Sequence, residues 1–147
     1  MKINYAAVAA SAVFYWALGG LWYSPLLFGR KFIEIMRWTP EQVARIEAEG
    51  AGAQLALAFL ASLVAAYVLA HLVRYTNAET AAAGAKTGLW LWLGFIVTTN
   101  LNTVFFEFRP LGLFLINIAY HLVAFLSMGA LLAAWRKRSV AKAPAYV

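Results

Sequence analysis

Four long apolar stretches dominate the chain, and the segments between them carry nearly all of its charged residues. The stretches cover residues 3–23, 51–73, 81–106 and 111–135. Each is close to the roughly 20 residues that a helix needs to cross a ~30 Å hydrocarbon layer. None alternates apolar and polar residues as membrane barrel strands do, and only helices and closed barrels satisfy their backbone in lipid. The pattern predicts an all-α, polytopic membrane protein with a single domain, a bundle of four transmembrane helices.

The extramembrane segment 24–50 is predicted to contain a short interfacial helix between the first two spans. Thr39 is followed by Pro40 and Gln42, which are typical of a helix cap, a first-turn proline and a capping-box partner. This helix should end near Glu49. The residues before it mix aromatic and basic side chains, which suits the lipid interface. We favour a connector that rests on lipid headgroups over a lid above the outer mouth of the bundle.

Composition supports a membrane protein, because 64% of the residues are hydrophobic and 12% are charged. A soluble domain of 147 residues could not bury so much apolar surface. The first stretch is too long for a signal-peptide core, and it ends in Trp22 and Tyr23, an aromatic interface anchor followed by Pro25. We therefore expect this stretch to remain in the protein as its first transmembrane helix. The absence of cysteine excludes disulfides, thiol catalysis and thiolate metal sites.

The net charge of +6 is better explained by membrane topology than by nucleic acid, because the basic residues lie at the ends of the spans. The side that carries both termini has seven Lys and Arg residues, including four in a basic tail at 136–147, and the opposite side has five. The positive-inside rule then predicts cytoplasmic N- and C-termini. We expect membrane lipids as partners and no nucleic acid.

Small residues form candidate packing faces on three of the spans. The first span carries Ala6, Ala10 and Ala17 at helical spacing, and the third carries Gly84 and Gly88 as a GxxxG pair. The second span has a similar face, formed by Ala51, Ala58, Ala61 and Ala65. Such faces allow close approach of helix backbones in lipid. Gly84 and Gly88 could form the seam of a homo-oligomer or pack inside the bundle, and the sequence leaves both possibilities open.

Polar residues inside the third and fourth spans are the strongest indication of a functional site, because polar groups in hydrocarbon are costly. The two spans must be antiparallel neighbours, since residues 107–110 alone connect them. Counting from this turn places Asn117 near Thr99 and His121 near Phe95. We therefore predict a polar pocket that opens outward. Its candidate residues are Trp22, Tyr23, Gln54, Thr98, Asn102, Glu107, Arg109, Asn117, Tyr120 and His121.

His121 is the most reactive side chain of this predicted pocket. An imidazole near the middle of a span can titrate, bind a metal or relay a proton. No second histidine stands at ligand spacing and the chain has no Asp, so we expect no metal site and no cofactor. We favour a structural hydrogen bond from His121 to Asn102, Asn117 or a backbone carbonyl. For Glu107 and Arg109 we favour a salt bridge within the turn over catalytic roles.

Four segments resemble a known family of small bacterial four-helix membrane proteins, the domain of unknown function 1761. They are INYAAV at 3–8, GGLWYSPLLFG at 19–29, LWLGFIVTT at 91–99 and FEFRPLGLFLINIAYHL at 106–122. The resemblance covers nearly the whole chain and implies a four-span bundle in the bacterial inner membrane, without an assigned activity. Phe108 stands where many relatives would have a small residue such as glycine.

Three functions are compatible with the sequence. The first is binding of a small molecule or lipid in the outward-facing pocket, as in a transporter or channel subunit. The second is a non-catalytic accessory or scaffold subunit that docks through its small-residue faces. The third, which we rank last, is a small membrane enzyme that acts on a lipophilic substrate with His121 as base. No catalytic residue is assigned, because general acid-base chemistry depends on distances that a sequence does not give.

Overall fold

The computed structural model describes residues 3–135, and all its elements within this range are helices. Lys2 and the basic tail predicted at 136–147 lie outside the described residues. In chain order the elements are α1 (Tyr5–Trp22), α2 (Gly29–Met36), α3 (Pro40–Glu49), α4 (Gly52–Tyr75), α5 (Ala81–Leu91), the π-helical segment η1 (Trp92–Val97), α6 (Thr98–Phe105) and α7 (Leu111–Ala134). The predicted all-α fold is confirmed.

Four helical runs are long and apolar enough to cross a membrane: α1, α4, the continuous run α5–η1–α6 from Ala81 to Phe105, and α7. Their ends lie within two residues of the bounds predicted from hydropathy. The protein is therefore a multi-pass membrane protein.

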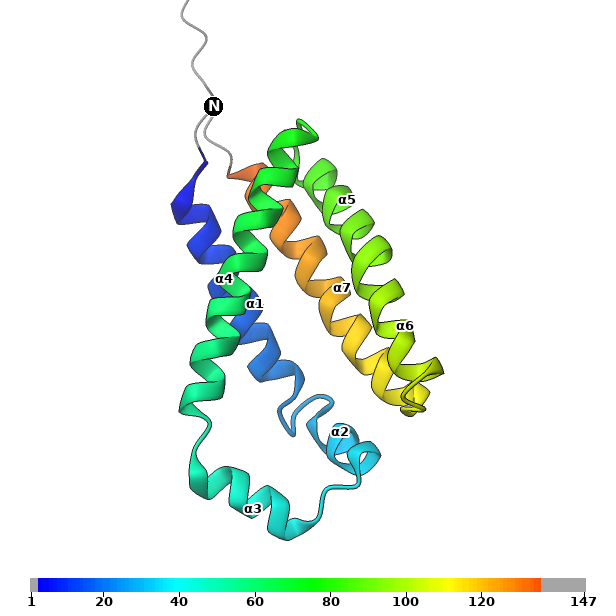
Figure 1. The fold of residues 1–147 in the computed structure, drawn as a ribbon. Helices are drawn as coiled ribbons and strands as arrows, with labels where there is room; N and C mark the ends of the chain where they lie inside the picture. Colours follow the sequence, from blue (N-terminus) through cyan, green and yellow to red (C-terminus); the bar gives the residue numbers. More distant parts are fainter. Residues whose placement is uncertain (1–2, 136–147) are drawn as a thin grey trace, which may run out of the picture.

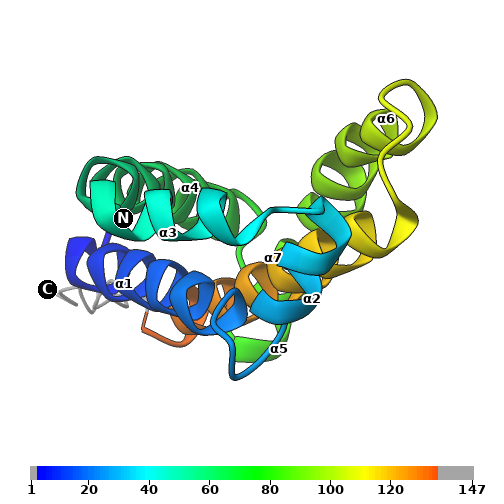
Figure 2. The ribbon, with the colours of Figure 1, turned by 90° about the horizontal axis from the view of Figure 1, so that it is seen from below.

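Helix α7 is the centre of the bundle, because it contacts α1, α4 and the whole run α5–η1–α6. Figure 1 shows α1 beside α4, and α7 beside α5 and α6. We call the end with the N-terminus and the α4–α5 connection the terminal end. The other end, with α2, α3 and the α6–α7 turn, is the distal end. Seen from below in Figure 2, α4 and α6 lie far apart on either side of α7.

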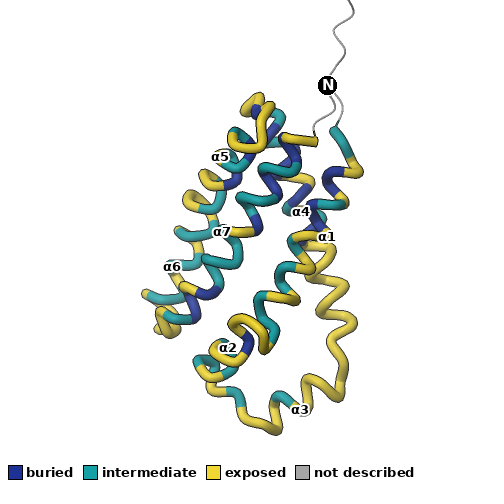
Figure 3. Tube along the Cα trace, turned by 180° about the vertical axis from the view of Figure 1, so that it is seen from behind, coloured by how far each residue is buried: buried dark blue, intermediate teal, exposed yellow. Residues whose placement is uncertain are grey.

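The hydrophobic core lies in the terminal half of the bundle. Ala12 of α1, Ala66 and Leu69 of α4, and Ala124 and Met128 of α7 are at most 1% exposed. Figure 3 shows mainly intermediate and exposed residues along the distal parts of α1 and α4 and along α3. Tight packing at one end therefore leaves the distal half of the bundle more open, and this is where the candidate site lies.

The buried face of α1 differs from the predicted one. Ala6 and Ala17 are exposed, whereas Ala7, Ser11 and Ala12 are buried. The prediction followed small residues alone. The observed face also includes the half-buried Tyr15, whose phenol hydrogen-bonds to His121 and stacks on Tyr120 of α7. Because an aromatic side chain belongs to this face, a stripe of alanines did not reveal it.

Gly84 and Gly88 pack inside the bundle, which selects one of the two interpretations of the GxxxG pair. A Cβ atom on Gly84 would lie 2.0 Å from the carbonyl oxygen of Gly129, and one on Gly88 would lie 2.1 Å from that of Phe125. Only glycine permits this backbone-to-backbone contact between α5 and α7. A homo-oligomer would therefore need a different face of the protein.

The π-helical segment η1 changes the register between the third and fourth spans. Counting along the sequence placed His121 at the level of Phe95. Because Gly88 faces Phe125, His121 lies instead nearer the level of Trp92. Trp92 also donates its indole N–H to the carbonyl of Ile118 over 2.7 Å. A π turn, with i→i+5 bonds, holds more residues than an α turn, so the third span needs more residues to cover the same distance.

The segment between the first two spans folds as α2 and α3. The predicted capping box is present, with Thr39 and Gln42 bonded to each other's backbone N–H, and α3 ends at Glu49 as expected. No residue of α3 is buried. Helix α2 contacts the start of α7, where Ile35 lies against Gly112. The segment is thus a surface connector along α3 and a packed element of the bundle along α2.

The α6–α7 turn contains the predicted salt bridge, with Arg109 Nε 2.7 Å from a carboxylate oxygen of Glu107. Phe108 between them has a φ of 52°. This left-handed conformation favours glycine. The departure from a small residue at this position therefore places a strained phenylalanine in the turn.

Candidate ligand-binding site

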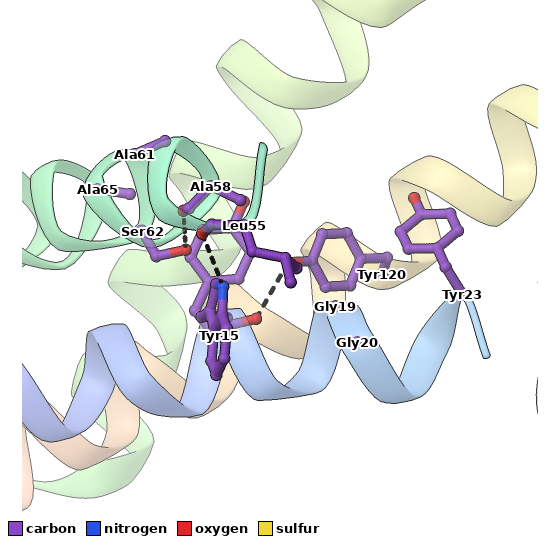
Figure 4. Close-up of a pocket in the computed structure, with 11 residues that line it drawn as sticks. Tyr15, Gly19, Gly20, Tyr23, Leu55, Ala58, Ala61, Ser62, Ala65 and Tyr120 are labelled. Carbon is purple, nitrogen blue, oxygen red and sulfur yellow. Dashed lines mark hydrogen bonds between the residues drawn. The ribbon is translucent and has the colours of Figure 1, made fainter. Parts of the chain in front are cut away.

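A cavity of about 470 Å³ lies in the distal half of the bundle, between α1 and α4 and beneath one side chain of α7 (Figure 4). The residues that line it are Tyr15, Trp16, Gly19, Gly20, Tyr23, Leu55, Ala58, Ala61, Ser62, Ala65 and Tyr120. Small residues of α4 form one wall and aromatic residues of α1 form the other. Ala58 and Ala61 are exposed, so the cavity opens sideways, at membrane depth.

Tyr120 closes the α7 side of this cavity and is fixed by its contacts with α1. Its hydroxyl donates to the backbone carbonyl of Tyr15 over 3.1 Å, and the two rings stack with centroids 5.4 Å apart. Gly19 makes room for it, since a Cβ atom there would lie 2.9 Å from the Tyr120 hydroxyl. The absence of a side chain at Gly19 thus sets the position of the phenol at the cavity wall.

His121 lies behind the cavity and is held by Tyr15. The Tyr15 hydroxyl and His121 Nδ1 are 2.7 Å apart, and His121 is half-buried. The expected structural hydrogen bond therefore exists, but its partner is Tyr15 rather than Asn102, Asn117 or a carbonyl. The sequence analysis did not identify Tyr15. Ser11, Tyr15 and Gly19 are spaced by four residues and so lie on one face of α1, which was overlooked. That spacing is the signal that could have found it.

The exit of α1 is tied to α7 by two hydrogen bonds. Tyr23 donates its hydroxyl to Asn117 Oδ1 over 2.7 Å, and Trp22 donates its indole N–H to the carbonyl of Ile116 over 3.2 Å. The chain then turns sharply. Gly29 ends this turn, where a Cβ atom would lie 2.3 Å from the carbonyl oxygen of Tyr23. The aromatic exit and its glycine hold the Tyr23 phenol at the cavity.

The structure brings some of the predicted site residues together around α1 and α7. Within hydrogen-bond or ring contact of one another are Trp22, Tyr23, Asn117, Tyr120 and His121. Of these, Tyr23 and Tyr120 line the cavity. Glu107 and Arg109 pair with each other in the α6–α7 turn, and Gln54 is exposed at the start of α4.

Polar residues of the third span form hydrogen bonds to backbone carbonyls of the same span. Thr98 donates to the carbonyl of Gly94, Thr99 to that of Phe95, and Asn100 to that of Ile96 over 2.8 Å. These carbonyls belong to the π-helical segment η1, where side-chain donors can satisfy backbone groups inside lipid. Thr98 is exposed, as is Asn102. Neither residue lines the cavity.

The cavity offers hydrogen-bond acceptors rather than charges. Trp16 donates its indole N–H to the carbonyl of Leu55, and Ser62 donates to that of Ala58. Tyr23 and Tyr120 likewise use their hydroxyl protons within the protein. Each hydroxyl oxygen still has lone pairs that can accept a bond. Within residues 3–135 no three His, Asp or Glu residues gather where they could hold a metal ion.

Comparison with known families assigns the chain to a family without a known activity. The family described as protein of unknown function (DUF1761) matches residues 6–133, which cover all four spans except the first residue of the first and the last residue of the fourth. No curated protein and no solved structure gives a match. The protein is an integral membrane protein of the DUF1761 family, to which no activity is assigned.

Proposed function

We propose that the protein binds a small amphiphilic molecule or lipid in the cavity between α1, α4 and α7. The observation that carries this proposal is an apolar cavity at membrane depth with phenol oxygens on its wall. A volume of about 470 Å³ falls within the range of ligand pockets, roughly 300–1,000 Å³. Ligand pockets are commonly apolar with a few placed polar groups, as this one is.

The chemistry of the wall favours an apolar ligand that carries a hydrogen-bond donor. The hydroxyl oxygens of Tyr23 and Tyr120 are acceptors for a hydroxyl, amide or amine. The lateral opening beside Ala58 and Ala61 would let such a molecule enter from the hydrocarbon layer. The terminal half of the bundle is tightly packed, so a transport path would need a second subunit or a rearrangement of α4.

A filled cavity is the sharpest test of this proposal. Ala58→Phe places a ring in the cavity, whereas Ala56→Phe adds the same ring to an exposed position of α4 that does not line it. Native mass spectra of the purified protein in nanodiscs should show a retained small-molecule mass in the wild type and in Ala56→Phe. That mass should be lost in Ala58→Phe. Retention in all three proteins, or in none, would contradict the proposal.

A scaffold role is the second candidate, because a lateral groove lined by Gly20, Ala58 and Ala61 would also accept a helix of another membrane protein. The same spectra distinguish the two. A retained polypeptide in place of a small molecule, lost in Ala58→Phe and kept in Ala56→Phe, would favour the accessory subunit. A membrane enzyme would require conversion of a lipophilic substrate that depends on His121.

We further propose that the termini lie in the cytoplasm of a bacterial inner membrane. The support is the excess of Lys and Arg on the side of the termini, seven against five. The distal end, with α3 and the half of the bundle that contains the cavity, would then lie on the periplasmic side.

A further inference from the structure

A second groove lies at the terminal end of the bundle, far from the ligand-binding cavity. It runs between the end of α4, the α4–α5 connection and α5, and it has a volume of about 470 Å³. Its lining residues are Leu72, Thr76, Asn77, Ala78, Ala83, Lys86, Thr87, Trp90, Leu91 and Phe95. The Thr76 and Thr87 hydroxyls, 3.1 Å apart, join the two helices across it.

One end of this groove is polar and positively charged. Lys86 is exposed and forms no ion pair within residues 3–135. The hydroxyls of Thr76 and Thr87 and the side chain of Asn77 lie at the same end. Glu79, in the adjoining connection, does not line the groove. An anionic group at this end would therefore meet a lysine that pairs with no carboxylate of residues 3–135.

The other end of the groove is apolar and exposed. Trp90 is 61% exposed and Phe95 is 65% exposed, although both lie inside the third span. The indole N–H of Trp90 has no hydrogen bond in the part of the chain that the structure describes. In contrast, Trp16, Trp22 and Trp92 each donate to a backbone carbonyl of another helix. The groove thus presents a free donor between its charged end and its apolar end.

We infer that this groove binds an anionic phospholipid of the adjacent leaflet. Lys86 lies five residues after the start of α5, about 7.5 Å along the axis, from where a lysine can extend to the headgroup level. Phe95 lies a further nine residues on, at most about 13.5 Å deeper at ~1.5 Å per residue, since the π-helical residues from Trp92 advance less. A headgroup phosphate on Lys86 and an acyl chain along Trp90 and Phe95 match this order. A free phosphate would leave the apolar end empty.

Quenching of tryptophan fluorescence by brominated lipids tests the inference directly. The full-length protein is placed in phosphatidylcholine nanodiscs that contain a minor fraction of brominated phosphatidylglycerol, or the same fraction of brominated phosphatidylcholine. We expect about fivefold stronger apparent binding of the anionic lipid, the factor that corresponds to about 1 kcal/mol for one lysine near the surface. Trp90→Phe should remove the preferentially quenched component.

Charge variants isolate the role of Lys86. Lys86→Gln should abolish the preference for the anionic lipid, and Lys86→Arg should keep it. Lys31→Gln is the matched control, because Lys31 is exposed at the distal end and paired with Glu34. Equal quenching by both lipids in the wild type, or an unchanged preference in Lys86→Gln, would overturn the inference. Competition by inorganic phosphate would overturn it in favour of a free anion. The site is separate from the cavity proposed above, so the two tests fail independently.

Discussion

Replacement of Gly88 by alanine should strongly destabilise the bundle, because the new Cβ atom has no space. It would lie 2.1 Å from the carbonyl oxygen of Phe125, whereas ordinary contact begins near 3.4 Å. The α5 and α7 backbones would have to separate by about 1.3 Å at Gly88, the difference between these two distances. Overpacking costs about 1–3 kcal/mol, and we expect about 3 kcal/mol here because the obstacle is backbone rather than a side chain.

The matched control is Gly94→Ala on the same span, where a Cβ atom would meet nothing within 4 Å. Both variants replace one glycine by alanine in the same continuous helical run, so most of their difference in stability reports packing. Unfolding in mixed micelles of increasing SDS fraction, followed by tryptophan fluorescence, should show an equilibrium constant for unfolding about a hundredfold larger for Gly88→Ala than for Gly94→Ala. Equal stability of the two variants would refute the assignment of the glycine face to α7.

Two further predictions concern the α1–α7 hydrogen bonds and the topology. Tyr15→Phe and His121→Phe should each destabilise the protein, and the double variant should cost about 0.6 kcal/mol less than the sum, the average for hydrogen bonds between membrane helices. Additive costs in the same SDS titration would argue against coupling through this bond. Because the chain has no cysteine, Glu47→Cys on the exposed α3 should react with a membrane-impermeant maleimide from the periplasmic side of intact cells. Labelling only after lysis would reverse the proposed orientation.

Hydropathy and local capping signals were sufficient to predict the four spans and α3, but not α2. The four spans follow from the length of the apolar runs, and Thr39 with Gln42 marked the start of α3. These features depend on neighbouring residues alone, since a backbone in lipid must bond within its own segment. The salt bridge of Glu107 and Arg109 was predicted for the same reason, because the two residues are two positions apart.

The arrangement of the site could not be predicted, because it depends on how far each helix is rotated and shifted. The π-helical segment η1 moves His121 toward the level of Trp92, and hydropathy contains no sign of it. Thr98 was expected to line a pocket but bonds to the carbonyl of Gly94, one turn earlier. A polar side chain in a span satisfies either a neighbour or its own backbone, and the sequence does not distinguish these outcomes.

The π-helical segment gives the third span two different faces along its length. An α-helix advances by about 100° per residue, so one additional residue in a turn rotates everything after it by about that angle. Gly84 and Gly88 are thereby aligned with α7, while Thr98 and Asn102 are turned toward the exterior. The faces of α5 and α6 are therefore rotated relative to each other. Removal of one residue from Trp92–Val97 would rotate α6 back into line with α5. The sequence of the distal half would then present another set of side chains to α7, without a single substitution.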